Sequence, residues 1–432
     1  MAKKSYAPVE VTLEKIIGGG QTLGALDDGR KLFVWGGLPG ERVRVQITKR
    51  KSNYAEGVVT DILEPSTERI APIDPESYLS TSPWQIMTFE AEQRYKSQLI
   101  DEAFAMHHAP LALPVEIYSN GREYGYRNKV EFSFWFDTDT QSLSLAFFRR
   151  GTHGKISVNG TSLAHRNINQ YAQRILTALN HHNITGRSLK TLLMRCDSDG
   201  KVAWQLYVKE EDFPVDILAE LLSEGRGEII FSNPKSPASV ITTRLTPQVE
   251  PLSDTILNVP FRYATEGFFQ INLPVYEQAL RDMQQWVEPD KPVLDLYSGV
   301  GSIGLTIGGD NVTLVEINEH AVREMRQNIE TLGSNAEAIL AASENALDFI
   351  TADKTIIVDP PRAGLHQAVV DRLLEVKPAR IIYLSCNPVT QARDVALLAG
   401  AYKAVDAKGY NFFPRTPHIE HLVVLDVLQN SK

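Results

Sequence analysis

The stretch VLDLYSGVGSIGL, residues 293–305, decides the fold that the sequence predicts. It begins as an apolar strand and continues into a loop with the spacing Gly-x-Gly-x-x-Gly. A strand, a glycine loop and a helix form the first unit of a Rossmann-like sheet, whose loop approaches a nucleotide-containing cofactor. Three further apolar runs each precede a helical pattern: VTLVEI (312–317), TIIVDPP (355–361) and RIIYLS (380–385). This alternation predicts a parallel sheet covered by helices on both faces.

Two other regions precede this sheet, since 432 residues exceed one ordinary core. Residues 9–64 alternate apolar and polar positions between glycine turns, which predicts a small β-barrel. Strand-like runs mixed with a helix around 165–181 predict a central α+β domain. We therefore expect an α/β and β multi-domain protein with an OB-like barrel over 1–65, a central domain over 66–88 and 121–262, and a Rossmann-like domain over 263–432.

Composition limits the class of protein. Hydrophobic residues make up 43% and charged residues 22%, as in globular proteins, and the formal net charge is −9. Two distant cysteines exclude a disulfide scaffold and fit a reducing compartment. The sequence has no apolar stretch of about 18 residues, and its start lacks the apolar region of a signal peptide. We therefore expect a soluble, cytoplasmic protein without membrane partners, in which any nucleic-acid site is local.

Five cations lie within ten residues of the predicted barrel: Arg42, Arg44, Lys49, Arg50 and Lys51. A basic strand on a small barrel can hold an RNA backbone. It can equally be a solvated face, and the charge pattern leaves both interpretations open.

The glycine loop suggests a cofactor. Gly-x-Gly-x-x-Gly with Glu316 twenty-one residues after Asp295 is compatible with a dinucleotide. However, Asp295 at the strand end would repel a pyrophosphate and suits a cationic ligand. S-adenosylmethionine has a sulfonium charge, no phosphate, and ribose hydroxyls that Glu316 can bind. We therefore favour S-adenosylmethionine over a dinucleotide, with a turn that binds nothing as the remaining alternative.

A candidate nucleophile follows a neighbouring strand. Asp359 and Cys386 both end apolar runs, so they should meet at one edge of the sheet. Asn387 and Pro388 fit an N-cap and first helical position, and a helix N-terminus favours a thiolate. Cys196, by contrast, is expected to be buried and inert.

The residue after the proline pair narrows the target. Enzymes that methylate exocyclic amino groups have an aromatic residue there, and this chain has Arg362. A cysteine without that aromatic suits methylation at a pyrimidine carbon: a thiolate adds to carbon 6 of uracil to activate carbon 5, and a base then removes the carbon 5 proton.

Three segments resemble the signatures of the RNA 5-methyluridine (uracil-C5) methyltransferases in order and spacing: DPPRAGL (359–365), YLSCNPVT (383–390) and FPRTPHIEHLVVL (413–425). The barrel is similar to the family's TRAM RNA-binding domain, and YGYRNKVEFSF (124–134) also matches. The resemblance implies that Cys386 is the nucleophile and Glu420 the base. It also implies that the helix over 89–106 packs against the catalytic domain, so that the Rossmann-like domain comprises residues 89–120 and 263–432.

The predicted site thus has three groups of residues. The catalytic ones are Cys386 and Glu420. The cofactor-binding ones are Gln270, Tyr297, Glu316 and Asp359, which match the family's contacts, with Asp295, Gly299 and Gly301. The RNA-binding ones are Arg42, Arg44, Lys49, Arg50, Lys51, Arg127 and Lys129.

The chain lacks the cysteines with which many family members hold an iron–sulfur cluster. Many members hold a [4Fe–4S] cluster with four cysteines, but the matching region APIDPESYLSTSPWQIM (71–87) has none. Cys196 alone cannot hold a cluster that needs four thiolates, so we expect no iron–sulfur cluster and no other metal. Ser302 and Ala342 also differ from the residue types that the family often has at these positions.

The resulting hypothesis is a monomeric, S-adenosylmethionine-dependent uracil-C5 methyltransferase that acts on RNA, with 23S rRNA favoured by the resemblance. The alternatives are a tRNA uracil-C5 methyltransferase, a cytosine-C5 RNA methyltransferase, and a catalytically idle RNA-binding protein. The presence of Asp359, Cys386 and Glu420 together argues against the last of these.

Overall fold

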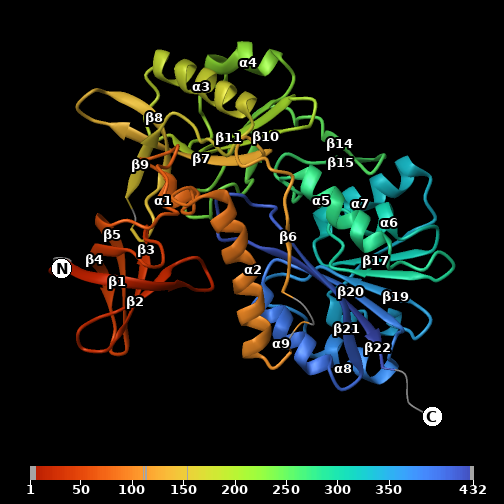
Figure 1. Cartoon of the computed structure of the whole chain (residues 1–432). Helices are drawn as coiled ribbons and strands as arrows, with labels where there is room; N and C mark the ends of the chain where they lie inside the picture. The colour runs from red at the N-terminus through yellow and green to blue at the C-terminus, as the bar shows by residue number, and fades with distance from the viewer. Residues whose placement is uncertain (1–5, 110, 112–113, 153, 429–432) are drawn as a thin grey trace.

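The computed structural model describes residues 6–109, 111, 114–152 and 154–428. The predicted domain ends at 1–5 and 429–432, and positions 110 and 112–113 of the predicted 89–120 segment, lie outside the described residues. Three bodies follow one another in Figure 1: a barrel, a central sheet and a larger α/β sheet. The fold class predicted from the sequence is confirmed. Of the helices in the described part of the chain, none combines the length and apolar character needed to cross a membrane.

The N-terminal body is a closed barrel of five strands in the order β1-β2-β3-β5-β4. Alternate residues of its strands, such as Leu13, Val34 and Val45, point inward and form a separate apolar core. The strands are β1 (Val9–Ile16), β2 (Thr22–Ala25), β3 (Lys31–Trp35), β4 (Arg42–Arg50) and β5 (Tyr54–Glu64).

The central body is a seven-stranded sheet in the order β13-β12-β11-β10-β7-β8-β9. The predicted helix is α3 (Arg166–His181), and its buried face packs on one side of this sheet. The other elements are β7 (Lys129–Asp137), β8 (Ser142–Phe148), β9 (Lys155–Val158), β10 (Leu189–Cys196), β11 (Val202–Val208), η1 (Val215–Leu218), α4 (Ala219–Ser223), β12 (Gly227–Phe231) and β13 (Thr243–Arg244).

The third body is an eight-stranded sheet in the order β18-β17-β16-β19-β20-β22-β21-β6. The strands from β18 to β20 are parallel, as the βα alternation predicts, and β22 runs antiparallel to its neighbours. Its strands are β16 (Val293–Leu296), β17 (Val312–Glu316), β18 (Glu337–Leu340), β19 (Thr355–Val358), β20 (Arg380–Ser385), β21 (Tyr402–Tyr410) and β22 (Glu420–Val427). Its helices and turns are α5 (Leu273–Gln284), α6 (Gly304–Ile307), α7 (Glu319–Leu332), η2 (Ser343–Asn345), η3 (Leu347–Phe349), α8 (Gln367–Val376) and α9 (Pro388–Leu398).

An early segment completes this third body. Helix α2 (Phe89–Met106) lies beside α9, with Ile100 and Phe104 in the core of the α/β sheet (Figure 1). Strand β6 (Ile117–Tyr118) pairs in parallel with β21. The fully buried Lys96 Nζ donates to Asn411 Oδ1 at 2.6 Å, so the contact spans 315 positions of sequence.

The hairpin of β14 (Leu252–Ile256) and β15 (Val259–Tyr263) differs from the predicted boundary at 262. Its apolar residues join the core that α5 and α7 cover, rather than the core under α3. The reason is its alternation: every second residue of each strand is buried, and that face meets the third body. By packing, the α/β body therefore begins before residue 252.

The segment between barrel and α2, predicted as a linker without periodicity, contains only the short helix α1 (Tyr78–Thr81). Its polar residues nevertheless tie it to the central body. Asp74 accepts hydrogen bonds from Ser162 Oγ at 2.7 Å and from Gln85 Nε2 at 3.1 Å. This Asp74 network lies in the region where the family resemblance would place cluster cysteines.

Candidate active site

A cavity of about 860 Å³ lies at the carboxyl ends of the central parallel strands. These strand ends meet at one edge of an α/β sheet, where ligands bind in such folds. The structure brings eight of the predicted residues to its wall: Gln270, Tyr297, Gly299, Glu316, Asp359, Cys386, Glu420 and Arg127. Ser302 and Ala342, where the chain departs from the family, also line it.

The glycine loop is shaped by left-handed backbone. Tyr297 has φ +66° and Gly301 has φ +85°, where an added Cβ would approach Leu305 within 2.9 Å. The Glu316 carboxylate accepts the backbone N–H of Gly299 at 3.0 Å and of Asn318 at 2.7 Å. Glu316 therefore closes the loop onto the end of β17 and faces the cavity at the same time.

Asp295 and Gly301 do not reach the cavity wall. The Asp295 carboxylate is fully buried beneath the loop and accepts the backbone N–H of Gly304 at 2.9 Å. Burial raises the pKa of Asp295 to about 8. In this structure, Asp295 supports the glycine loop from behind instead of lining the cavity.

Strand pairing brings the nucleophile and the base together. Strand β22 pairs antiparallel with β20, and Ser385 lies opposite His421. The next residue in each direction is Cys386 after β20 and Glu420 at the start of β22, so both lie at the same edge and line the cavity. Asn387 caps α9 by accepting the N–H of Val389, and Pro388 takes the first helical position, as predicted.

Burial dominates the protonation of the two groups. Burial raises the pKa of Cys386 to about 11, the carboxylates of Glu420 and Asp359 add to this rise, and Arg362 opposes it. The helix N-terminus at Asn387, which favours a thiolate, acts against this rise. Burial and the charge of Asp359 raise the pKa of Glu420 well above its usual range, and burial raises that of Asp359 to about 7.

Sequence reasoning missed His418, and it gave Arg362 no role in the site. The Arg362 guanidinium lies 3.3 Å from His418 Nδ1, and both side chains line the cavity. Burial, followed by the charge of Arg362, lowers the pKa of His418 to about 4, so the imidazole is neutral and accepts this hydrogen bond. A signal was available: alternate residues of an extended segment face the same side, which places His418 with Glu420.

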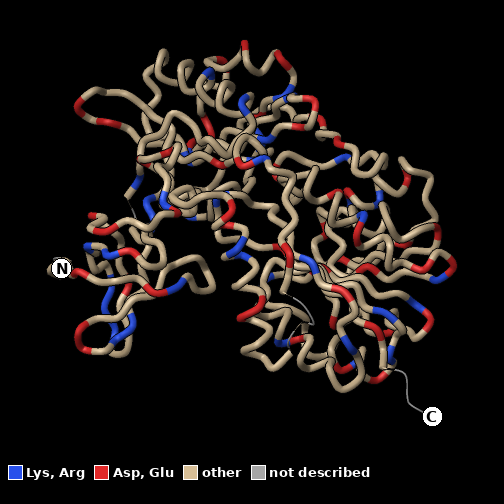
Figure 2. The backbone as a smooth tube through the Cα atoms, viewed as in Figure 1, with Lys and Arg blue, Asp and Glu red and all other residues tan. Residues whose placement is uncertain are grey.

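The predicted RNA-binding cations fall into different surroundings. On the barrel, Arg42 and Arg44 both pair with Glu10, and Figure 2 shows basic and acidic segments interleaved there. Lys129 Nζ donates to the carbonyls of Glu266 and Gly267 at 2.9 and 3.1 Å. It thus supports the loop that leads to Gln270, whereas Arg127 lines the cavity itself.

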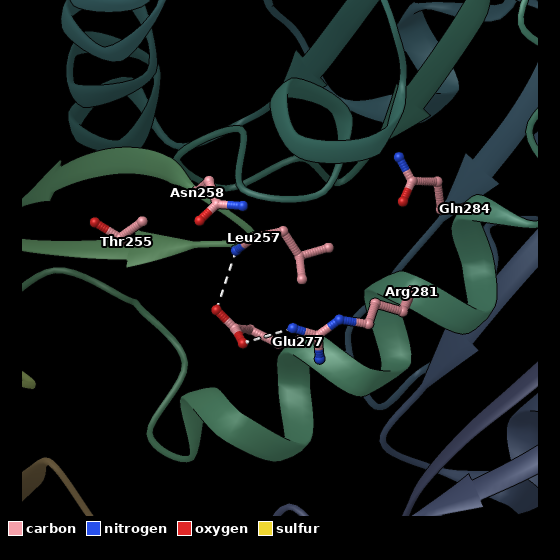
Figure 3. Close-up of a pocket in the computed structure, with 6 residues that line it drawn as sticks. All are labelled: Thr255, Leu257, Asn258, Glu277, Arg281 and Gln284. Atoms are coloured by element: carbon pink, nitrogen blue, oxygen red, sulfur yellow. Dashed lines mark hydrogen bonds and ion pairs between the residues drawn. The ribbon is translucent and has the colours of Figure 1, made fainter.

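A second hollow lies between the β14–β15 turn and α5 (Figure 3). Its two charged residues, Glu277 and Arg281, pair with each other, and Glu277 also accepts the backbone N–H of Leu257. These contacts occupy its polar groups, so it offers no chemistry comparable to the main cavity. Over the residues that the structure describes, no group of three or more His, Cys, Asp or Glu side chains could hold a metal ion.

Two family models match parts of this chain. Residues 246–428 match the model of the tRNA (Uracil-5-)-methyltransferase family, and residues 6–60 match that of the TRAM domain. An uncharacterized RNA methyltransferase of Enterococcus faecalis is 27% identical, over 92% of this chain and 93% of the relative. One of Thermosynechococcus vestitus is also 27% identical, over 97% of this chain and 98% of the relative.

Among solved structures, the Pyrococcus abyssi tRNA (uracil-54, C5)-methyltransferase in complex with S-adenosyl-L-homocysteine superposes with a TM-score of 0.77. The match covers 96% of this chain and 100% of that one at 22% identity, so it shows a shared fold.

Proposed function

We propose that this chain is an RNA uracil-C5 methyltransferase, as the family model matched over residues 246–428 suggests, and that it methylates carbon 5 of a uridine in 23S rRNA through Cys386 and Glu420. The observation that supports this best is the β20–β22 pairing, which places a cysteine and a carboxyl group at one edge of the cavity. Carbon 5 chemistry needs both a nucleophile and a base.

The residues at one end of the cavity fit S-adenosylmethionine. Glu316, Glu344 and Asp359 line this end, and their carboxyl groups suit a sulfonium and ribose hydroxyls but would repel a pyrophosphate. We propose that Glu316 binds the ribose, and that Tyr297, Gly299, Gln270 and Asp359 complete the contacts. Bound S-adenosylmethionine supplies the electrophilic methyl group that carbon 5 of uracil takes up.

The side chains of this protein perform the remaining steps. Cys386 first loses its thiol proton to water. The resulting thiolate adds to carbon 6, so an S–C bond forms and the electron pair of the C5–C6 double bond moves toward the carbonyl oxygen on carbon 4. After methylation, the carboxylate of Glu420 removes the proton on carbon 5. The double bond re-forms as the S–C bond breaks, which returns Cys386 as a thiolate. A stacked uridine cannot reach this cavity, so the base must be flipped out of the RNA.

A tRNA is the second candidate substrate, because the Pyrococcus abyssi enzyme that shares the fold is named for uracil-54 of tRNA. The two candidates are separated by mass-spectrometric nucleoside mapping of 23S rRNA and tRNA from a deletion strain. Loss of one 5-methyluridine from 23S rRNA is the expected result, and loss from tRNA alone would assign the second candidate.

The roles of the two catalytic residues are tested by trapping. Glu420→Gln cannot remove the carbon 5 proton, which costs about 10²–10⁴-fold in rate, so a methylated protein–RNA adduct should accumulate on a denaturing gel. Cys386→Ala is the matched control, since nothing can add to carbon 6 and no adduct forms. Normal turnover by Glu420→Gln, or an adduct in Cys386→Ala, would contradict the assignment.

A further inference from the structure

We propose that the RNA strand leaves the cavity past Arg127 and crosses a surface, here called the hairpin patch, at the β8–β9 turn beside the barrel. The hairpin patch consists of Trp35, Phe148, Arg149, Arg150 and Lys155. This inference rests on the proposed function and identifies the surface that holds the RNA backbone. It differs from the prediction that the basic strand β4 is that surface.

The cations of β4 are already neutralised by their neighbours. Arg42 pairs with Glu10 and Glu64, and Arg44 with Glu10 and Asp61. Lys49 and Arg50, at the other end of the strand, pair with Glu56 and Asp28 respectively. Of the five predicted barrel cations, Lys51, which follows β4, has no ion pair among the described residues. A phosphate that approached β4 would therefore meet carboxylates as well as cations, and the local field would not favour an anion.

The cations of the hairpin patch have different neighbours. Within the described residues, no ion pair is found for Arg149, Arg150 or Lys155, in a chain whose formal net charge is −9. Burial alone lowers the pKa of Arg150, and burial together with Lys209 lowers that of Lys155, with no carboxylate opposing either shift. Arg150 donates to the backbone carbonyls of Leu79 and Ser80, and Lys155 Nζ donates to that of Phe134, so both charges meet carbonyls but no carboxylate. Charge without a carboxylate partner attracts phosphates.

Aromatic rings lie beside these cations. The Arg150 guanidinium lies 4.1 Å from the centre of the Trp35 ring, which joins the hairpin to β3 of the barrel. Lys155 Nζ lies 5.2 Å from the ring centre of Phe148, whose side chain is 59% exposed. An exposed ring beside cations is what single-stranded RNA binds, because bases stack on the ring while the cations hold phosphates.

Positive charge is present both at the cavity and at the hairpin patch. Arg362 and Arg127 line the cavity. After burial, the charges of Arg362, Lys96, Arg127 and Arg150 lower the pKa of the cavity residue His418. Figure 2 shows basic segments where the β8–β9 turn approaches the barrel. The proposed RNA path therefore joins the cavity, which Arg127 lines, to the hairpin patch beside β3 of the barrel.

The test measures binding of a fluorescein-labelled oligouridylate, about 12 nucleotides long, as a function of salt. The patch variant is Arg149→Gln with Lys155→Gln. Losing two phosphate contacts should flatten the log–log salt slope by about 1.4, since each contact contributes about 0.7 on single strands. Phe148→Ala should weaken binding at every salt concentration without changing the slope, because it removes a stacking partner and no charge.

Two charge-matched pairs of substitutions complete the design. Arg42→Gln with Arg44→Gln removes two cations from β4, and Lys354→Gln with Lys403→Gln removes two on the third body. We expect both to keep the slope of the unaltered protein. A slope flattened by the β4 pair and kept by the patch pair would overturn the proposal, as would equal flattening by all three. Transfer of a tritium-labelled methyl group from S-adenosylmethionine to RNA is measured separately. A protein that binds RNA through the hairpin patch but does not methylate it would contradict only the proposed function.

Discussion

The protonation of Cys386 gives the sharpest test of the site. Its thiol has a pKa of about 11 in place of the ordinary 9.0, because it is buried beside two carboxyl groups. At pH 8 an ordinary thiol is about one-tenth ionised, whereas this one is about one-thousandth ionised. Since only the thiolate is alkylated, we expect Cys386 to react with iodoacetamide about 100-fold more slowly than a free thiol.

The assay is mass-spectrometric quantification of the alkylated Cys386 peptide between about pH 7 and about pH 10. Reading this peptide separates its signal from Cys196, which is fully enclosed and whose pKa burial raises to about 12. The logarithm of the rate should rise with pH by about one per unit throughout, without a plateau. A plateau at or below about pH 8.5 would refute the reasoning, because it would mean that Cys386 is a stabilised thiolate.

A variant identifies the charge that opposes this rise. Arg362 is the group that lowers the pKa of Cys386, so Arg362→Gln should slow alkylation further. Arg323→Gln, on the exposed part of α7, is the matched control and should react like the unaltered protein. Equal rates for the two variants would mean that Arg362 does not act on the thiol.

Three further predictions concern stability and composition. Because the pKa of Asp295 is raised to about 8, its contribution to stability is present below about pH 4 and is lost as pH rises through about 8. Between about pH 6 and about pH 9, the melting temperature of Asp295→Asn should therefore fall less than that of the unaltered protein. Equal falls would contradict this. Asp74→Ala removes the acceptor of the Ser162 hydroxyl and one of the acceptors of Gln85 Nε2. Urea titration should therefore show a loss of about 1–3 kcal/mol in the free energy of unfolding, and a loss confined to a few tenths would contradict a tying role. The purified protein should contain no stoichiometric iron or acid-labile sulfide by colorimetric assay, since two cysteines cannot supply four thiolates, and stoichiometric iron would exclude that account.

Much of the fold could be predicted because its signals are local. Apolar runs followed by helical patterns predict the parallel strands, and Asn387 with Pro388 predicts the start of α9. The place of β14 and β15 could not be predicted, because their alternation shows that one face is buried, but not against which body.

The site was harder to predict wherever its properties depend on distant residues. The β20–β22 register, which joins Cys386 to Glu420, is a long-range pairing that no local pattern specifies. The same holds for the pKa of the thiol, since a helix start can be seen in sequence but the carboxyl groups that enclose it cannot. The carboxylates that neutralise β4 likewise come from other strands of the barrel, including Glu10.

The early position of α2 has a consequence for how the chain is made. The helix is synthesised 315 residues before Asn411, the buried partner of Lys96, and the central body is translated in between. At a translation rate of roughly 5–20 residues per second, about 15–60 s pass between the synthesis of α2 and that of Asn411, and the apolar face of α2 stays uncovered during this time. The central body and the barrel can complete their own cores in that interval. The core of the third body cannot be completed until translation is nearly finished. The nascent chain therefore needs protection, by a chaperone or by the ribosome surface, at α2 rather than at the sheet that forms the cavity.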